Sequence, residues 1–445
     1  MPVQFFSTNN RSNVQPLKEA VLRSLPVDRG LYLPIEIGRL PDEFWQDWRD
    51  WPLAELGFQV TRHLFQGSVA DDDLRDIVSD AINFPAPLKR LDDDLAVLEL
   101  FHGPTLAFKD FGARFMARLM GHLTRDDDAD LTVLVATSGD TGGAVAGAFH
   151  HVPGTKVIIL YPSGGVSPLQ EKQLTTLGGN VSAIEVSGTF DDCQRLVKSA
   201  FADRPLSQRH NLTSANSINI SRLIPQSFYY FDAARQLEVD QHPCFIVPSG
   251  NFGNLTAGLL AQRMGLPVAY FVAATNTNDV VPQYLREGTY LPRPSVATLS
   301  NAMDVGAPSN FARMVDLFAR QSDPEGDQLS DVAAHPDMST RISGVSFDDQ
   351  QTKQAIRQVW DRYGYAMCPH TAVGYLAAQQ QSGDGQQIIL ATAHPSKFLP
   401  TMESVLGDGA VEIPLRLACL ADRAKVAVSM QPDEATFFEY LNQQS

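Results

Sequence analysis

The sequence predicts an α/β fold in which parallel or mixed sheets carry helices on both faces. Three observations predict it. From residue 96 onward, short apolar runs alternate with segments of helical periodicity. The apolar runs are continuous, which is typical of strands buried on both faces of a parallel sheet. Glycine-rich turns join several of these runs to the helix that follows, as in TSGDTGG at residues 137–143.

Residues 1–95 have a different character. They hold the tryptophan-rich stretch DEFWQDWRDWPL, several acidic turns and helix-like patterns, and no glycine-rich loop. We therefore expect a small, mostly helical N-terminal domain over residues 1–95. The rest of the chain, residues 96–445, is expected to form two α/β subdomains, with an irregular insertion at about 285–345.

Six apolar runs predict the strands of this second region. They cover residues 131–138, 156–162, 181–188, 244–249, 267–276 and 387–394. Helices are expected between them. Thr189 is a candidate N-cap of the helix after the third run, and Ser346 is a candidate cap of the helix that ends at Gly364. Within the insertion, one helix is expected near residues 311–321.

Composition limits the classes of function. The chain has 445 residues, a hydrophobic fraction of 44% and a formal net charge of −16. This acidity argues against nucleic acid or an anionic membrane as a partner. No apolar run approaches the roughly 18 residues that span a bilayer. The first residues lack the basic stretch and apolar core of a signal peptide. We expect a cytoplasmic protein.

The spacing of the cysteines and histidines matches no disulfide framework and no metal-binding motif. The four cysteines are far apart and form no C-x-x-C pair, and the ten histidines include no H-E-x-x-H motif. We expect neither a disulfide framework nor a metal site.

Ligands of open α/β sheets bind at the carboxyl ends of the strands, so the loops after the strands are the candidate sites. The loop at 137–143 combines hydroxyls, glycines and helix-start amides, which suit a carboxylate or phosphate. The loop at 248–254, PSGNFGN, suits a phosphate held by backbone N–H groups. Thr392 ends the last strand, and Arg222 could clamp a phosphate. For each of these, the alternative is an ordinary structural turn.

Lys109 lies between Phe108 and Phe111 at what the pattern predicts to be a helix start. A cation beside the positive end of a helix dipole is a poor structural choice. The same surroundings lower the pKa of a lysine, and a lysine must lose its proton before it can form a Schiff base. The alternative is a solvated surface lysine.

These motifs together resemble threonine synthase, in its bacterial and fungal form with a short N-terminal domain. The motifs are FHGPTLAFKDFG, TSGDTGGAV, SPLQEKQLTTLGGN, NSINISRL, PSGNFGNLTAGLLA, FVAATNTNDVVP, ATLSNAMDV and TAHPSKF. They occur in the family's order and cover nearly the whole chain. The resemblance implies the fold-type-II, tryptophan-synthase-β-like architecture of pyridoxal-phosphate (PLP) enzymes, with a family-specific N-terminal domain at 1–95 and a catalytic region at 96–445.

The resemblance also implies roles for particular residues. Lys109 matches the Schiff-base lysine, and Thr392 matches the hydroxyl facing the pyridine nitrogen. The loop for the cofactor phosphate matches Gly250, Asn251, Phe252, Gly253 and Asn254. The loop that receives the substrate carboxylate, near the phenolic oxygen of the cofactor, matches Ser138, Gly139, Asp140 and Thr141. The group for the substrate phosphate matches Arg222, Asn219 and, less directly, Asn254.

Asp140 departs from the wider superfamily, in which many members have asparagine at this position. A carboxylate near a phenolate is repulsive unless it is protonated or turned aside. Its contact is left open.

The implied activity is that of a carbon–oxygen lyase acting on phosphate. It converts O-phospho-L-homoserine and water to L-threonine and phosphate, the last step of threonine biosynthesis. One alternative is another enzyme of the same fold, such as a serine or threonine dehydratase. A more distant one is a non-catalytic amino-acid-binding protein. We expect a monomer, with a homodimer as the alternative.

Overall fold

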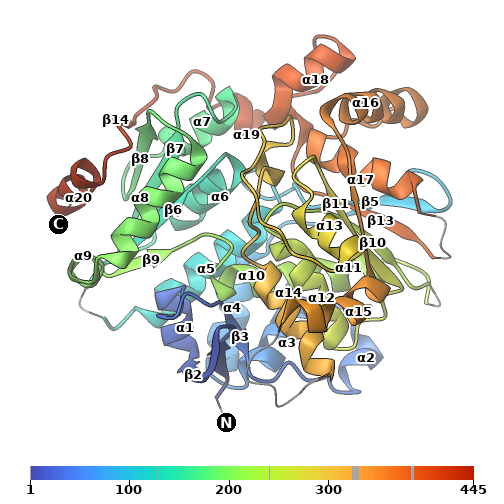
Figure 1. Cartoon of the computed structure of the whole chain (residues 1–445), viewed down its shortest axis with the longest axis horizontal. Coiled ribbons are helices and arrows are strands. Elements are labelled where there is room, and N and C mark those ends of the chain that lie inside the picture. Colours follow the sequence, from blue (N-terminus) through green and yellow to red (C-terminus); the bar gives the residue numbers. More distant parts are fainter. Residues whose placement is uncertain (1, 128, 240, 323–329, 382–384, 445) are drawn as a thin grey trace.

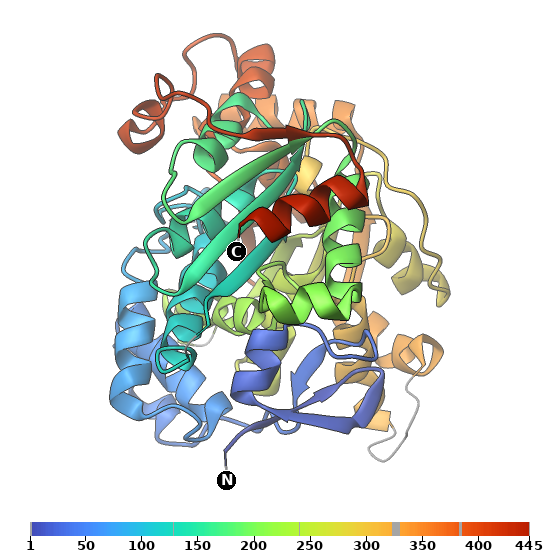
Figure 2. The same cartoon turned by 90° about the vertical axis from the view of Figure 1, so that its left-hand side faces the viewer.

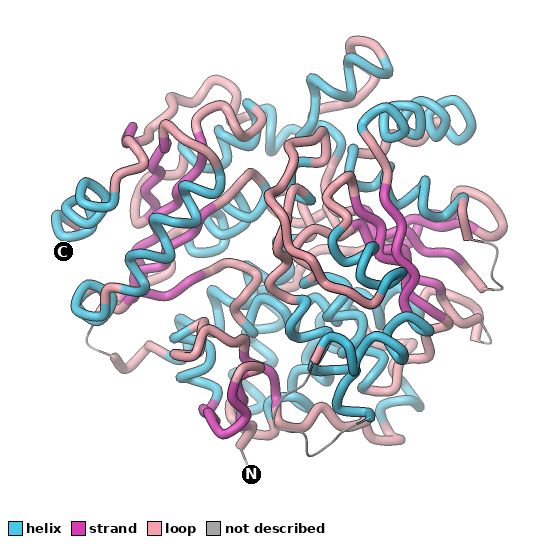
Figure 3. The backbone as a smooth tube through the Cα atoms, in the orientation of Figure 1, coloured by secondary structure: helices cyan, strands magenta, loops and turns pink. Residues whose placement is uncertain are grey.

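The computed structural model describes residues 2–127, 129–239, 241–322, 330–381 and 385–444. Two α/β halves lie side by side, and the N-terminal elements lie beneath both of them (Figure 1). Loops gather in the space between the two main sheets (Figure 3). Within the described residues, no helix is both long enough and apolar enough to cross a membrane.

The N-terminal segment contains more helix than strand, as expected. Its helices are α1 (Leu17–Arg23), α2 (Phe44–Asp47), α3 (Leu53–Phe65) and α4 (Asp71–Ala81). It also holds an antiparallel sheet that the sequence did not predict, made of β1 (Gln4–Ser7), β2 (Asn10–Pro16) and β3 (Tyr32–Pro34) in the order β2-β1-β3. The central strand β1 is buried, but β2 (NRSNVQP) is polar and partly exposed, so it lacks the apolar signal of a strand.

The larger half is built on a six-stranded sheet in the order β12-β11-β10-β13-β5-β4. Its strands are β4 (Leu88–Arg90), β5 (Leu95–Glu99), β10 (Cys244–Pro248), β11 (Tyr270–Thr275), β12 (Ile342–Ser346) and β13 (Gln387–Ala391). All neighbours pair in parallel except β4, which runs antiparallel to β5 at the edge. Because β10, β13 and β5 are adjacent and parallel, the loops that follow them emerge at the same edge.

The smaller half has a five-stranded parallel sheet in the order β14-β8-β7-β6-β9. Its strands are β6 (Leu131–Ala136), β7 (Thr155–Pro162), β8 (Val181–Val186), β9 (Leu212–Ser214) and β14 (Val428–Met430). Figure 2 shows the C-terminal strand β14 and the following helix packed against this half. The chain therefore returns at its end to the sheet it began near residue 131.

Helices cover both faces of the two larger sheets. The first eight along the chain after the N-terminal segment are α5 (Lys109–Leu123), α6 (Asp140–Phe149), α7 (Pro168–Thr175), α8 (Phe190–Ala202), α9 (Arg204–Arg209), α10 (Ile220–Leu223), α11 (Phe228–Arg235) and α12 (Gly253–Arg263). Those that follow are α13 (Val280–Glu287), α14 (Phe311–Ser322), α15 (Asp331–Arg341), α16 (Asp349–Tyr363), α17 (Pro369–Gln379), α18 (Leu399–Leu406), α19 (Leu415–Ala418) and α20 (Glu434–Gln443). Three short 3-10 helices, η1 to η3, cover Ile224–Ser227, Asn301–Met303 and Pro395–Phe398.

The strand period of two divides the core into three clusters. Phe245 and Val247 of β10 face the largest cluster, whereas Ile246 faces the cluster beneath α16 and α17. In β6, Val133 joins the largest cluster and Leu134 joins the cluster beneath α8 and α20. The largest cluster also contains the N-terminal helices, so one core joins the N-terminal segment to both halves.

Two expectations about helix starts have opposite outcomes. Thr189 caps α8, accepting from the Asp192 N–H in a capping box, as predicted. The expected Ser346 cap of α16 is wrong, because Ser346 ends strand β12 and Asp348 makes the capping box. Both Ser346 and Asp348 are good cap residues by type. The pattern alone did not show that a strand runs through residue 346.

The expectation of an irregular insertion at 285–345 needs correction. Only residues 288–310 lack longer helices and strands, while α14, α15 and β12 follow them. The helix near residues 311–321 is confirmed as α14. Strand β12 (ISGVS) escaped detection because it is an edge strand, partly exposed and poor in apolar residues. Residues 323–329 of this segment lie outside the described residues.

Two buried polar residues join the N-terminal segment to the rest of the chain. Asn219 donates from Nδ2 to the Val21 carbonyl (2.9 Å) and to Ser24 Oγ (2.8 Å). Arg313 of α14 donates to the carbonyls of Tyr32 (3.0 Å) and Ile218 (2.7 Å). Both side chains are fully buried, and none of the described ion pairs includes Arg313. These residues add buried polar contacts to the apolar core that joins the N-terminal segment to the rest of the chain, and we call these contacts the seam.

We expect Asn219→Ala to destabilise the whole protein, because it leaves buried acceptors without a donor. The loss should be about 1–3 kcal/mol for each group left unpaired. Urea unfolding followed by fluorescence checks it. Asn219→Asp keeps the oxygen that accepts from the Ser221 N–H but sets a buried carboxylate oxygen against the Val21 carbonyl, so we expect it to destabilise the protein at least as much. An unchanged urea midpoint in both variants would contradict this role.

Candidate active site

The structure brings most of the predicted site residues to one cavity between the two halves. The predicted residues that line it are Lys109, Asp140, Arg222, Gly250, Asn251, Phe252, Gly253, Asn254 and Thr392. They come from the carboxyl ends of β5, β10 and β13 and from loops of the smaller half. Ser138, Thr141 and Asn219 do not line the cavity in this structure. Asn219 lies in the seam described above.

Lys109 is the first residue of α5, as predicted, and a short antiparallel bridge places it. Ala107 pairs with Ala393. The Phe108 N–H donates to the Thr392 carbonyl (2.8 Å), and the His394 N–H donates to the Leu106 carbonyl (3.0 Å). This bridge holds the start of α5 beside the end of β13. The lysine and Thr392 therefore share one wall of the cavity, although 283 residues separate them in the sequence.

Asp110 shapes the turn before Lys109. Its buried carboxylate accepts from the Thr105 N–H (2.9 Å) and the Thr105 hydroxyl (2.7 Å). A Cβ on Gly103 would lie 2.4 Å from Oδ2 of Asp110, so only glycine fits there. Leu106 in the same turn has a φ of 60°, a conformation uncommon for a leucine. Several independent contacts therefore fix the shape of this turn, which directs the amine of Lys109 into the cavity.

Burial, together with the nearby Arg222 guanidinium, lowers the pKa of Lys109 to about 8, and Asp140 opposes this shift only in part. The amine lies 4.7 Å from the centre of the Phe108 ring. With a pKa near 8, about half of the amine is neutral at pH 8, against roughly 0.3% for an ordinary lysine. The site thus provides a nucleophilic amine near neutral pH.

Asp140, whose contact was left open, forms a buried ion pair. Its Oδ1 lies 2.7 Å from Nζ of Lys397 and accepts from Nε2 of Gln170 at 2.9 Å. Burial alone would raise the pKa of this carboxyl, but Lys397 and Gln170 outweigh it and hold the pKa below its ordinary value. The aspartate is therefore ionised and turned toward Lys397. Its predecessor Gly139 has a φ of 144°, and a Cβ there would lie 2.6 Å from the Gln170 amide.

The loop 250–254 presents backbone donors. The hydrogen bonds among the described residues include none donated by the N–H groups of Gly250, Asn251 or Phe252. Helix α12 begins at Gly253, so its first amides also point into this loop. A Cβ on Gly250 would lie 2.6 Å from the Ala302 carbonyl, which makes a side chain impossible at this position. The loop is a cup of N–H groups suited to a phosphate.

The two asparagines of this loop differ in what they leave free. The Asn251 side chain is used internally, since it donates to Ser217 and accepts from the Ser309 N–H. The Asn254 oxygen accepts from the hydroxyls of Tyr229 and Tyr230, both at 2.7 Å. Its Nδ2 is buried and has no partner. Asn254 therefore keeps a donor available for a ligand.

Arg222 is the second buried cation of the cavity. Its guanidinium donates to the Ala215 carbonyl, while its Nε is buried without a partner. None of the described ion pairs includes it. Burial lowers its pKa to about 10, which still leaves the side chain charged. Asp110 is the carboxylate whose charge acts on Arg222, but the two form no ion pair. A buried, charged arginine without an ion pair indicates an anion site.

Sequence reasoning missed several residues at the cavity. His370, Ser217 and Gln226 line it, and Lys397 stands behind Asp140. Ser217 lies within the motif NSINISRL and Lys397 within TAHPSKF, so both were in quoted stretches but were not singled out. A lone histidine in an apolar helix, like His370, carries no signal before the fold is known.

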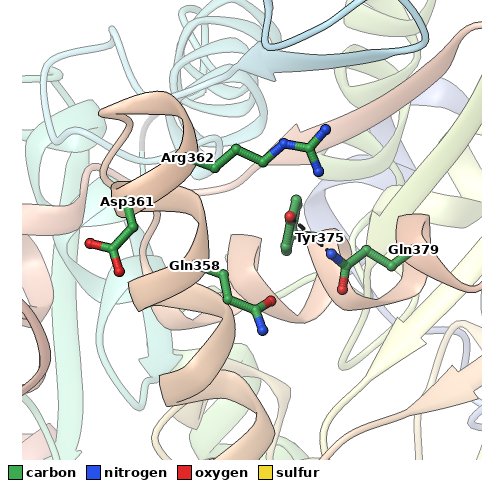
Figure 4. Close-up of a pocket in the computed structure, with 5 residues that line it drawn as sticks. All are labelled: Gln358, Asp361, Arg362, Tyr375 and Gln379. Carbon is green, nitrogen blue, oxygen red and sulfur yellow. Dashed lines mark hydrogen bonds between the residues drawn. The ribbon is translucent and has the colours of Figure 1, made fainter.

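A second hollow lies on the outer surface between α16 and α17 (Figure 4). It is lined by Gln358, Asp361, Arg362, Tyr375 and Gln379. Gln379 donates to the Tyr375 hydroxyl at 2.9 Å. The hollow is at the opposite end of α17 from His370 and contains neither a lysine nor a buried group without a partner. It has no features of a catalytic site.

Comparison with known proteins matches this geometry. A family model described as pyridoxal-phosphate dependent enzyme matches residues 82–392, and models of the threonine synthase N terminus and of its C-terminal part match residues 4–82 and 371–440. The curated threonine synthase of Escherichia coli is 41% identical over 436 residues, covering 97% of this chain and 98% of that protein. The chain belongs to the threonine synthase family.

Solved structures agree with this assignment. A PLP-bound threonine synthase from Brucella melitensis has a TM-score of 0.91 and 34% identity, with 100% of this chain and 99% of that one covered. A tomato threonine deaminase has a TM-score of 0.54 at 18% identity, covering 77% of this chain and 90% of that one. The deaminase shares the fold alone.

The residues present fit the PLP of this threonine synthase family. The cofactor needs an amine for its aldehyde and donors for its phosphate. Lys109 supplies a lowered-pKa amine, and the unpaired N–H groups after Gly250 supply an anion cradle that a side chain would fill. The orphaned donors of Asn254 and Arg222 lie on the same cavity.

We expect covalent capture of PLP by the apoprotein to accelerate as the pH rises through about 8 and to level off above it. The sign follows from the lowered pKa of Lys109, because only the neutral amine attacks an aldehyde. Stopped-flow absorbance gives the rate. Borohydride trapping with peptide mass analysis gives the position, and Lys109→Arg is the control that should capture nothing there. A midpoint near 10.5, the ordinary lysine value, would contradict the expectation.

Proposed function

We propose that this protein converts O-phospho-L-homoserine and water to L-threonine and phosphate, with PLP held on Lys109. The observation that carries the proposal is the pairing of a reactive amine with two separate anion sites in one cavity. The amine is Lys109, and the anion sites are the amide cup after Gly250 and the buried Arg222. A cofactor and a substrate that both carry phosphate need two such sites.

The reaction moves a hydroxyl to a carbon that did not carry the leaving group. Phosphate leaves the γ carbon of the substrate, the oxygen of water ends on the β carbon, and protons are removed and returned along the chain. When bound, PLP would supply an electron sink for the substrate carbon skeleton. The protein must then supply a base, hold both phosphates and keep stray water out.

Lys109 is the proposed base. Once the substrate amine has displaced it, its own amine is free within the cavity. Its lowered pKa lets it take a proton from the α carbon and return it elsewhere near neutral pH. Phe108 beside it and the buried turn before it limit access of bulk water. One amine close to several carbons can serve several proton transfers.

The anion sites divide the two phosphates between them. We assign the cofactor phosphate to Gly250, Asn251, Phe252, Gly253 and Asn254 through their backbone N–H groups and the free Asn254 amide. We assign the substrate phosphate to Arg222, which has a buried Nε without a partner and forms no ion pair among the described residues. Asn219, proposed with it from the resemblance, acts through the position of α10, since its side chain is bonded within the seam.

Two further assignments complete the site. The loop of Ser138, Asp140 and Thr141 receives the substrate carboxylate; in this structure only Asp140 of these lines the cavity. Thr392, at the end of β13, faces the ring nitrogen of the cofactor. A hydroxyl there makes the ring a milder electron sink than a carboxylate would, which favours elimination of phosphate over side reactions.

The alternatives are a serine or threonine dehydratase and a non-catalytic amino-acid-binding protein. Each would lack a use for a buried arginine poised for a second phosphate. We further propose a cytoplasmic protein that is a monomer, as the family resemblance implies, with a homodimer as the alternative. Its net charge of −16 argues against nucleic acid as a partner. We also retain the division into an N-terminal domain at 1–95 and a catalytic region at 96–445.

The decisive experiment is incubation of the PLP-loaded protein with phosphohomoserine. We expect threonine and phosphate in equal amounts, identified by amino-acid analysis and a phosphate assay, and no product with Lys109→Ala. Serine and threonine serve as competing substrates, since a dehydratase would release ammonia from them. Ammonia release without threonine formation would reject the proposal.

Arg222→Ala should raise KM for phosphohomoserine and lower kcat, because a misplaced leaving group also slows its departure. The lost charge-assisted hydrogen bonds are worth about 1.5–3 kcal/mol, or about a 10- to 150-fold loss in kcat/KM. Arg222→Lys keeps the charge but loses the planar guanidinium, so its kcat/KM should lie between those of wild type and Arg222→Ala. Steady-state kinetics at saturating PLP checks this, and near-wild-type values for Arg222→Ala would remove Arg222 from the phosphate site.

A further inference from the structure

His370 lines the cavity but has no role in the mechanism above. It is the second residue of α17 (Pro369–Gln379) and only 3% exposed. It shares the cavity with Lys109, Asp140 and Thr392. A buried polar ring among reacting groups needs a partner for each nitrogen.

The hydrogen bonds of the ring define which nitrogen carries the proton. The Ala302 N–H donates to Nε2 of His370 at 3.2 Å. Nε2 is therefore an acceptor, and in a neutral imidazole the proton must then be on Nδ1. Nδ1 is buried and has no partner among the described residues. The cavity is thus lined by an N–H donor that the protein itself leaves unused.

The ring is also kept neutral. Burial lowers the pKa of His370 to about 4; Asp140 opposes this shift, whereas Lys109 and Lys397 add to it. The positive end of α17 acts in the same direction. Near neutral pH the ring therefore does not exchange protons with a ligand. It is an oriented dipole with a fixed donor, held in place by the Ala302 amide.

We propose that the Nδ1–H of His370 donates a hydrogen bond to a negatively charged oxygen of the bound ligand. This inference rests on the proposed function, which places two anionic molecules in the cavity. The oxygen belongs either to the cofactor or to the substrate, and the same donor chemistry serves both. His370 is then a ligand-contacting residue that stabilises charge without adding a cation to a site that already holds Lys109, Arg222 and Lys397.

Two variants separate this role from a structural one. His370→Asn keeps an N–H donor near the position of Nδ1. His370→Gln keeps an acceptor near the position of Nε2, which can still serve the Ala302 amide. The proposal expects the asparagine variant to lie within about threefold of wild type and the glutamine variant to lose about 10- to 100-fold in ligand binding. A structural role at Ala302 expects the reverse order.

The measurements distinguish the source of the oxygen. PLP is titrated into apoprotein and its Kd read from absorbance, and KM and kcat for phosphohomoserine are then measured at saturating PLP. A loss in Kd assigns the oxygen to the cofactor, and an unchanged Kd with raised KM assigns it to the substrate. The proposal is overturned if the glutamine variant matches wild type in both, or if both variants lose equally. Failure of the proposed function is separate, because wild type itself would then give no threonine.

A measurement on the wild type keeps the proposal testable if the variants fold poorly. The apoprotein is labelled with ¹⁵N-histidine, and His370→Gln and the remote His335→Gln assign the signals. His335 lies on α15 and contacts the Leu285 carbonyl, away from the cavity. We expect His370 in the Nδ1–H form and unchanged between about pH 5.5 and 8, with a shift on adding PLP or phosphohomoserine. Titration near the ordinary value of 6.5, or no shift with either ligand, overturns it.

Discussion

The bridge between Ala107 and Ala393 is the constraint on which the site depends. It joins the segment before Lys109 to the end of β13 through the Phe108–Thr392 and His394–Leu106 hydrogen bonds. These bonds connect backbone groups, so they do not depend on which side chains are present. The bridge therefore fixes the position of Lys109, and of its amine, relative to the end of β13. The side chains of the cavity then adjust an amine whose location is already determined.

The cavity is rich in positive charge, although the protein as a whole is negatively charged. The chain has a net charge of −16, yet the cavity and its wall hold three buried cations, Lys109, Arg222 and Lys397. Two buried carboxylates accompany them: Asp140, which pairs with Lys397, and Asp110, in the turn before Lys109. Lys397 is neutralised by Asp140, whereas Arg222 has no such partner among the described ion pairs. Burial lowers the pKa of Lys109, and the charge of Arg222 adds to that shift while it also attracts anionic ligands. The same buried charges therefore help to keep the Lys109 amine reactive and to bind anionic ligands.

Much of this could be predicted from the sequence, because the informative residues lie in the loops after apolar strands. Continuous runs such as residues 131–138 and 244–249 predicted β6 and β10, and the lysine between two phenylalanines predicted the start of α5. Strand β5 (LAVLE) and the edge strand β12 were not identified. Each has five residues, as β10 does, so length is not the reason. Strand β12 is partly exposed and lacks the continuous apolar run that marked β10.

The missed site residues share a physical cause. His370 and Lys397 act through partners that are distant in the chain, Ala302 and Asp140, and no spacing rule connects them. Asn219 shows the opposite error. Its motif suggested a ligand contact, but its amide is used by Val21 and Ser24, which belong to a different domain in the sequence-based division. Long-range pairing decides whether a polar residue serves the ligand or the fold.

Arg313 carries a consequence for how this molecule can be divided. Its guanidinium donates to Tyr32 in the N-terminal sheet and to Ser217 and Ile218 in the loop beside Arg222. Ser217 itself lines the cavity. A shortened chain that begins after residue 95 would keep every proposed catalytic group and still lose one of the walls against which that loop is braced. The first 95 residues thus help to hold a loop of the cavity in place. Truncations or circular permutations that separate them from the rest of the chain would remove that support.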